Sequence, residues 1–365
     1  MRRLINTKRI SAFINSSDKM SKRLLNINPT LPAKRTDPKK IYISVYEYNM
    51  DKVFSFTPET IEDCYYLLES ANVCWINIDG LQKEEIEKIG NHFGIHPLIV
   101  EDILSLGQRP KMDDLNKRLY CLLNMLYYNE REKSVESEQV SLVLGAGFVI
   151  SFQEDEKRDL FNPVREKIKM SGSKIRQSNA DYLFYSLIDM IVDHYFVIME
   201  QLGEQIEELE DDITHRPDTQ TLVKINYLRK EMMYVRRNIS PVREMINGIL
   251  RSENDIIEEK TEKYFKDVYD HIVQANELAE NYRDMMINLQ DLYLSNVNLK
   301  MNEVMKVMAV VTCLMAPATV IGGIFGMNFN RIPWLHNPYG FFIAVGLMLL
   351  IPIWMIWMFK RRGWF

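Results

Sequence analysis

Two hydrophobic periodicities divide the chain. Between residues 41 and 170, apolar residues alternate with polar ones in some runs and recur every third or fourth position in others, which predicts a mixed α/β region. The alternating runs predict five strands, over residues 41–48, 74–78, 119–128, 139–144 and 148–152. The helical runs predict helices around residues 84–93, 97–106 and 163–171.

From Ala180 onward the periodicity is helical alone. A first helix is expected to end near Thr214, because Arg216-Pro217 interrupts the pattern and Asp218 or Thr219 can cap the next helix. The two helices are expected to form a hairpin.

A third helical pattern begins near residue 258 and continues without a clear stop into strongly apolar sequence. At 1.5 Å per residue, a helix of about 65 residues would be a rod of roughly 100 Å. One small domain cannot cover such a rod, so this stalk helix predicts partners, most simply copies of the same chain.

Two C-terminal segments are long and apolar enough to cross a membrane. Residues 307–325 and 341–359 each lack a formal charge over about nineteen residues, close to the length that spans a hydrocarbon core. Lysines flank the first segment on its near side and a Lys-Arg-Arg run (360–362) follows the second, whereas Arg331 is the only lysine or arginine between them. The positive-inside rule therefore predicts that both termini are cytoplasmic.

The sequence thus predicts an α+β membrane protein in four parts. These are a basic arm (1–40), a cytoplasmic α/β domain (41–175), a helical hairpin with a stalk helix (176–303), and a transmembrane hairpin (304–365).

Charge is polarised along the chain. The arm carries eleven Lys/Arg against two Asp, so the formal net charge of -5 leaves about -14 for the remainder. A disordered tail or electrostatic attachment to an anionic membrane face would both account for such an arm.

Several function classes lack their sequence signatures. The four cysteines are scattered in apolar runs, which predicts buried reduced thiols and no zinc cluster. The chain has no Walker lysine loop and no nucleophile elbow, so we expect neither an enzyme nor an ATP-driven pump, and no nucleic-acid partner.

One face of the stalk helix changes character as it enters the membrane. Its positions lie three or four residues apart, at Asp291, Leu294, Asn298, Met301, Met305, Met308, Thr312, Ala316, Thr319, Gly323 and Gly326. Within the membrane segment, from Thr312 to Gly326, the residues of this face are small or weakly polar, whereas the opposite positions are large and apolar. Two interpretations compete: close packing between membrane helices, and a narrow pore surrounded by several copies of the helix.

Two asparagines lie at the ends of this stripe. Asn302 lies beside it just before the membrane, and Asn328 follows just beyond its far end. Rings of amide oxygens could hold a hydrated cation by accepting hydrogen bonds from its water molecules. Mg²⁺ gives up its waters reluctantly, so such rings suit it.

At this point the chain resembles the CorA family. Gly326-Met327-Asn328 directly follows the first membrane helix, and a second helix with a basic tail closes the chain. Further matches are His96-Pro97-Leu98, Glu101-Asp102, Gln108-Arg109-Pro110-Lys111, Glu138-Gln139-Val140-Ser141, Ala180-Asp181-Tyr182-Leu183, Asp267-Val268-Tyr269-Asp270-His271 and Asn302-Glu303-Val304-Met305-Lys306. The likeness covers about residues 40–365.

The resemblance implies a funnel-shaped homopentamer in the cell (inner) membrane. Gly326, Met327 and Asn328 match the selectivity motif, with Asn328 in its outer ring. The positions that match the pore lining are Asn302, Met305, Met308, Thr312, Ala316 and Thr319. Asp102 and Asp291 match the pair that binds regulatory Mg²⁺ between neighbouring subunits, and Asp267 lies in a further acidic segment of the stalk.

Two positions and one loop depart from the family pattern. Phe325 replaces the common Tyr before the motif, and Ala316 stands where a bulky Met is common. The loop reads Ile332-Pro333-Trp334-Leu335 where Met-Pro-Glu-Leu is common, so it has no carboxylate to attract cations.

The function expected from the resemblance is passive, membrane-potential-driven Mg²⁺ uptake, gated by intracellular Mg²⁺. Two alternatives remain open: a Co²⁺, Ni²⁺ or Zn²⁺ transporter of the same fold, and a cytoplasmic sensor that the hairpin only anchors to the membrane.

Overall fold

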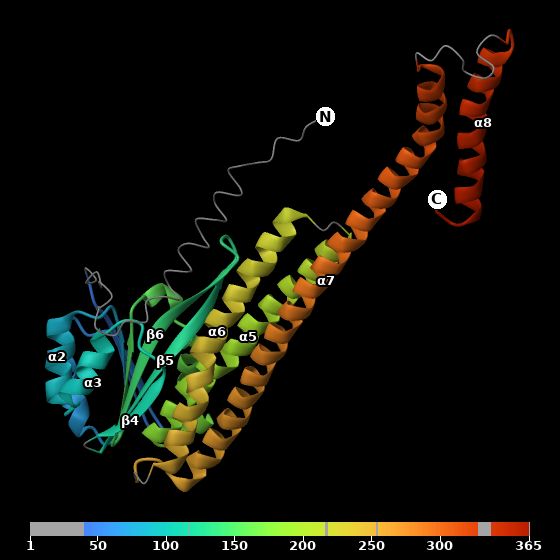
Figure 1. Ribbon diagram of the computed structural model, residues 1–365. Coiled ribbons are helices and arrows are strands. Elements are labelled where there is room, and N and C mark those ends of the chain that lie inside the picture. Colours follow the sequence, from blue (N-terminus) through green and yellow to red (C-terminus); the bar gives the residue numbers. More distant parts are fainter. Residues whose placement is uncertain (1–39, 116, 216–217, 253–254, 328–336, 365) are drawn as a thin grey trace. The chain divides into compact units, whose positions relative to one another are not determined.

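The structure is a computed structural model that describes residues 40–115, 117–215, 218–252, 255–327 and 337–364 (Figure 1). Asn328, Arg331 and the basic arm up to residue 39 lie outside the described residues. The chain divides into two compact units, the first ending at Gln290 and the second beginning at Asp291. Each unit is described by itself.

A seven-stranded mixed sheet forms the centre of the first unit, with strand order β2-β1-β3-β7-β6-β5-β4. The strands are β1 (Tyr42–Tyr48), β2 (Val53–Phe56), β3 (Val73–Asp79), β4 (Lys111–Leu115), β5 (Arg118–Asn129), β6 (Ser134–Gly145) and β7 (Phe148–Gln153). β3 and β7 run parallel, and every other neighbouring pair of strands is antiparallel. The parallel pair therefore joins the N-terminal strands to the β4–β7 meander.

Helices cover both faces of this sheet (Figure 1). One face is covered by the 3-10 helix η1 (Glu62–Glu69), α2 (Lys83–His92) and α3 (Pro97–Leu104). α5 (Ala180–His215) and α6 (Thr219–Arg251) contact the other face. The connection from β7 to α5 contains η2 (Glu156–Arg158), α4 (Asn162–Lys169) and η3 (Lys174–Gln177). Because both faces are covered, β3 and β7 are almost wholly buried, as strands between two helical layers generally are.

A chain of buried polar side chains follows the parallel pair. Trp75 Nε1 donates to Ser151 Oγ at 2.9 Å, and Ser151 Oγ donates to Asn77 Oδ1 at 2.6 Å. Asn77 Nδ2 and Gln153 Nε2 then donate to the two carboxylate oxygens of Asp79, at 2.9 and 3.1 Å. Burial, together with a neighbouring carboxylate, raises the pKa of Asp79 to about 7.

α7 (Glu259–Phe325) begins in the first unit and continues into the second. Its first part lies beside α5 and α6 (Figure 1). Its buried residues recur at helical spacing, at Phe265, Val268, Ile272, Ala275, Ala279, Met286 and Leu289. The ring centroids of Phe184 on α5 and Phe265 lie 6.4 Å apart, so aromatic packing joins the two helices.

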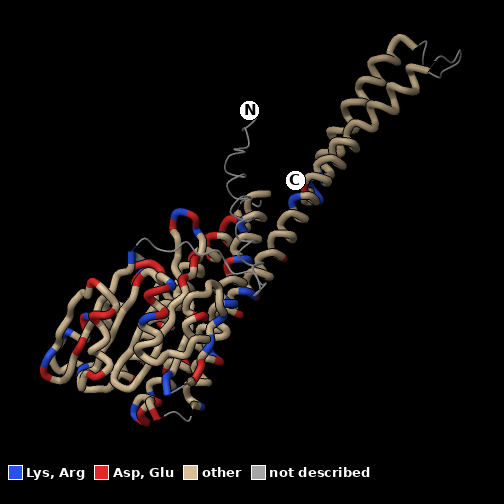
Figure 2. The backbone as a smooth tube through the Cα atoms, turned by 90° about the vertical axis from the view of Figure 1, so that its left-hand side faces the viewer, with Lys and Arg blue, Asp and Glu red and all other residues tan. Residues whose placement is uncertain are grey.

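The second unit consists of the remainder of α7 and α8 (Gly340–Arg361). Figure 2 shows that its helices carry few charged residues except near the end of α8. Among the described residues, three helices are long and apolar enough to cross a membrane, namely α5, α7 and α8. In α5, 56% of the apolar window is buried, as befits a helix that covers the sheet, but only 6% is buried in α7 and in α8. These exposed helices contain the two predicted spans.

The structure confirms the five predicted strands and the predicted helices, with boundaries that differ by a few residues. The predicted cap is confirmed at Asp218, whose side chain accepts from the Thr221 amide at 2.8 Å. β2, β4 and η1 were not predicted, and β6 begins five residues earlier than expected.

One expectation about the cysteines was wrong. Cys64, Cys74 and Cys121 are buried, but Cys313 is exposed. The apolar sequence around Cys313 belongs to the part of α7 in which most side chains are exposed in the single chain.

Candidate ion pathway and cation sites

The six residues predicted to line a pore lie on α7 and are all exposed in the single chain. They follow one another at intervals of three or four residues: Asn302, Met305, Met308, Thr312, Ala316 and Thr319. Such intervals keep side chains on one face of a helix. These six side chains therefore form one exposed face of α7.

The two threonines on this face have their hydroxyl protons committed to their own helix. Thr312 Oγ1 donates to the Met308 carbonyl at 2.9 Å, and Thr319 Oγ1 donates to the Met315 carbonyl at 3.0 Å. A hydroxyl bound in this way keeps lone pairs that can accept a hydrogen bond. Water molecules around a cation point their hydrogens outward, so this face is chemically suited to a hydrated cation.

The Gly326-Met327-Asn328 motif begins where α7 ends. α7 ends at Phe325, and the amide of Gly326 still donates to the Gly322 carbonyl at 2.9 Å. A Cβ atom at Gly326 would lie 3.0 Å from that carbonyl oxygen, so a side chain would crowd the turn. Gly326 and Met327 are exposed, and Asn328 lies outside the described residues.

Asp102 lies in the last turn of α3, with its carboxylate held in an ion pair. Lys111 Nζ lies 2.5 Å from Asp102 Oδ2 and 3.4 Å from Asp113 Oδ2. The side chain of Asp102 is 18% exposed. Gln139 Nε2 donates to the Asp102 carbonyl at 3.1 Å and fixes the end of the helix against the sheet.

Asp267 and Asp291, the other predicted regulatory residues, are both exposed on α7. They belong to different units, Asp267 to the first and Asp291 to the second. Twenty-four residues separate them along one helix, which corresponds to about 36 Å. Two acids of one chain at that spacing cannot share a single ion, so any ion on either must find its other ligands elsewhere.

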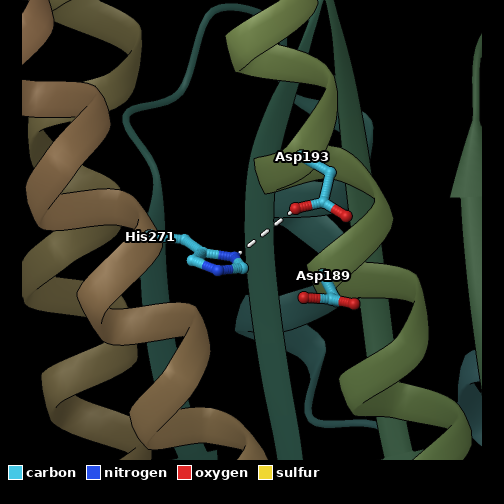
Figure 3. Close-up of side chains that lie close together, drawn as sticks. All are labelled: Asp189, Asp193 and His271. Carbon is cyan, nitrogen blue, oxygen red and sulfur yellow. Dashed lines mark ion pairs between the residues drawn. The ribbon is translucent and has the colours of Figure 1, made fainter.

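Among the described residues of the first unit, one group of side chains that could ligate a metal was not predicted as a site. Asp189 and Asp193 on α5 face His271 on α7, and each offers a ligand atom within 4.8 Å of the others (Figure 3). His271 Nδ1 lies 3.5 Å from Asp193 Oδ1, and the Tyr185 hydroxyl donates to Asp189 Oδ2 at 3.2 Å. Burial, reinforced by the charge of Asp193, raises the pKa of Asp189 to about 6.

Two carboxylates and one imidazole form a mixed oxygen and nitrogen donor set. Mg²⁺ prefers oxygen ligands, whereas Mn²⁺, Co²⁺, Ni²⁺ and Zn²⁺ also accept imidazole. The i, i+4 spacing of Asp189 and Asp193 is visible in the sequence. Their pairing with His271 is not, because it depends on how α5 and α7 pack.

Comparison with known proteins decides the family. A family model described as CorA-like Mg²⁺ transporter protein matches residues 70–361. The chain is also 38% identical over 323 residues to the cobalt/magnesium transport protein CorA of Thermotoga maritima, covering 88% of this chain and 92% of that one. This chain belongs to the CorA family.

Other relatives of this CorA-family protein agree. It is 30% identical over 291 residues to the putative metal ion transporter YfjQ of Bacillus subtilis, covering 80% of this chain and 89% of that one. The complete structure of the CorA magnesium transporter from Methanocaldococcus jannaschii matches the fold with a TM-score of 0.71 at 23% identity, over 88% of this chain and 98% of that one. The full-length CmaX structure matches with a TM-score of 0.65 at 19% identity, over 90% and 100%.

These comparisons confirm the predicted family and the α+β organisation with apolar C-terminal helices. The protein is therefore a membrane transport protein of the CorA type, in a family of Mg²⁺ and Co²⁺ transporters.

Proposed function

We propose that this chain assembles as a homopentamer around a pore lined by α7 and conducts Mg²⁺ passively into the cell. The observation that carries the proposal is the exposed face of α7, on which Met305 and Met308 are followed by the small or hydroxyl-bearing residues Thr312, Ala316 and Thr319. The bulkier apolar positions of the same helix, such as Val320 and Ile324, are exposed as well and suit contact with lipid or α8.

Passive uptake needs no chemical energy source. A charge that crosses 100 mV gains about 2.3 kcal/mol, so a divalent cation gains roughly 4.6 kcal/mol. We infer from the Lys-Arg-Arg run after α8 that both termini are on the cytoplasmic side of the inner membrane. The potential of a cell that is negative inside then drives cations toward the first unit.

We assign the outer recognition ring to Asn328 on its sequence position. Asn328→Ala should abolish Mg²⁺ flux, because it removes the amide oxygen that would accept a hydrogen bond from the ion's water shell. Asn337→Ala is the matched control, since it removes a side-chain amide from the same connection between α7 and α8. There Asn337 Oδ1 accepts a hydrogen bond from the Tyr339 backbone amide at 3.0 Å. Wild-type flux in Asn328→Ala would contradict the assignment.

Regulation by intracellular Mg²⁺ is the second part of the proposal. Asp102, Asp267 and Asp291 would meet carboxylates of neighbouring subunits, where two negative charges repel unless a cation lies between them. Bound Mg²⁺ would hold the subunits in a closed ring, and its loss would loosen them. Control of this kind requires that Mg²⁺ bind the closed state more tightly than the open one. Asp102→Asn with Asp291→Asn should weaken inhibition by internal Mg²⁺ and preserve conduction.

One observation favours a second class of ion. Asp189, Asp193 and His271 form a donor set better suited to Co²⁺ or Ni²⁺ than to Mg²⁺. We therefore keep as the alternative a protein of the same fold that transports or senses Co²⁺ or Ni²⁺.

Flux into liposomes tests the function as a whole. The full chain is reconstituted with a Mg²⁺-sensitive dye inside, and a potential is imposed with K⁺ and valinomycin. Mg²⁺ entry that rises with the imposed potential and needs no ATP is expected. Entry of Co²⁺ or Ni²⁺ without Mg²⁺ would favour the alternative ions, and absence of flux from correctly assembled protein would favour a membrane-anchored sensor.

A further inference from the structure

The ion pair between Asp102 and Lys111 brings a cation of the protein itself to a residue of the proposed sensor. Lys111 is the first residue of β4, at the edge of the sheet, and Asp102 is in the last turn of α3. Lys111 Nζ and Asp102 Oδ2 lie 2.5 Å apart, in direct charge-assisted contact. Burial opposes the charge on Lys111, but its bonds to Asp102 and Asp113 raise its pKa above the ordinary value, so the ammonium is charged at neutral pH.

We propose that Lys111 competes with the regulatory divalent cation for Asp102, so that its ammonium group occupies the carboxylate when intracellular Mg²⁺ is low. The inference rests on the proposed role of Asp102 in regulation. It adds a reason for the Mg²⁺ concentration at which the sensor responds, because Mg²⁺ must first displace the Lys111 ammonium from Asp102.

A second carboxylate gives the displaced ammonium a partner. Asp113 lies two residues further along β4, with Oδ2 3.4 Å from Lys111 Nζ. The side chains of Lys111 and Asp113 are 36% and 38% exposed, so the amine has room to move toward Asp113. A Mg²⁺ ion with its water shell could then bind Asp102 without leaving the lysine unpaired.

The position of Asp102 does not depend on the lysine. The Ser105 amide and Gln139 Nε2 both donate to its backbone carbonyl, at 3.2 and 3.1 Å. Gln139 Oε1 in turn accepts from the Gln108 amide at 3.4 Å. Removal of the Lys111 charge should therefore release the carboxylate and leave the helix end in place.

The variant Lys111→Met keeps the length of the side chain and removes the charge. We expect it to lower the Mg²⁺ concentration needed for half-maximal closure by about three- to tenfold, because the ion no longer displaces a paired, partly exposed ammonium. Closure is read as Mg²⁺-dependent protection of the full chain from a protease, at constant ionic strength, and separately as inhibition of flux. Lys111→Gln should shift both in the same direction, and Lys111→Arg should shift them little.

Lys88→Met is the matched control. Lys88 also bridges two carboxylates, Glu85 at 2.8 Å and Glu62 at 3.0 Å, but its partners are not in the proposed sensor. Removal of the Lys88 charge should leave the Mg²⁺ midpoint, the concentration needed for half-maximal closure, unchanged. Asp102→Asn should raise this midpoint. In the Asp102→Asn background, Lys111→Met should have no further effect, since the two residues act through one interaction.

The outcomes separate the two proposals. A raised midpoint in Asp102→Asn with an unchanged or raised midpoint in Lys111→Met and Lys111→Gln would overturn the competitor role and leave the sensor role of Asp102 standing. An unchanged midpoint in Asp102→Asn would overturn both.

Discussion

The buried carboxylate of Asp79 predicts a measurable pH dependence of stability. Its pKa is raised from 3.8 to about 7, mainly by burial, and only 5% of the residue is exposed. A raised pKa in the folded state means that the stabilising contribution is complete below about pH 4 and is lost as the pH rises through about 7. The first unit should therefore become less stable between pH 5.5 and pH 7.5.

The expected magnitude follows from the size of the shift. About three pKa units at 1.36 kcal/mol each set a ceiling of roughly 4 kcal/mol for the full range. The linkage between proton binding and folding predicts that about 2 kcal/mol of this stability is lost between pH 5.5 and pH 7.5. For a unit of this size, 1 kcal/mol corresponds to roughly 2–4 °C, so Asp79 contributes a fall in Tm of about 4–8 °C.

Thermal unfolding of the full chain at the two pH values, with a chelator present, measures this contribution. Asp79→Asn cannot titrate and is expected to lose most of the fall in Tm with pH. It should also be less stable than the wild type at pH 5.5, because its amide offers one acceptor to the two donors Asn77 and Gln153. Asp51→Asn, at an exposed position of the β1–β2 turn, should show the same fall in Tm with pH as the wild type. Parallel pH slopes for Asp79→Asn and the wild type would refute the reasoning.

Three further substitutions test other parts of the structure. In Gly145→Ala the new Cβ would lie 2.3 Å from the ring of Phe148, so the free energy of unfolding should fall by about 1–3 kcal/mol, measurable as a lower Tm. Asn238→Leu removes the buried acceptor of Asn124 Nδ2, now 2.9 Å away, and should cost about 1–3 kcal/mol; a neutral result would mean that water replaces the bond. Thr312→Val keeps the shape of the proposed pore lining and removes its oxygen, so liposome flux should fall while Tm stays the same; undiminished flux would argue against a role for this hydroxyl.

The elements with a strong hydrophobic period could be predicted from the sequence, whereas the missed strand β4 has no such period. β5 and α5 bury regular sets of apolar residues and were located within a few residues. β4 reads Lys111-Met-Asp-Asp-Leu, which has no strand pattern. It forms because its backbone pairs with β5, with Met112 opposite Cys121. Tertiary pairing of this kind leaves no local signal.

The candidate sites divide in the same way. The α7 stripe from Met301 to Thr319 could be found because its residues share one helix and therefore one period. The pairing of His271 with two aspartates of α5 could not, because it joins helices that are far apart in the sequence. The same holds for Lys111 beside Asp102: the sequence marks both as charged, and only the packing of α3 against β4 brings them within 2.5 Å.

The position of the parallel β3–β7 pair in the chain bears on biosynthesis. The last strand of the sheet ends at Gln153, whereas α8 begins at Gly340. Polypeptides grow at about 5–20 residues per second, so synthesis of the roughly 190 intervening residues takes about 10–40 s. Mixed α/β domains of modest size fold within milliseconds to seconds. The nascent chain therefore has time to complete its sheet before α8 leaves the ribosome, so we expect α8 to enter the membrane attached to a first unit whose sheet is already folded.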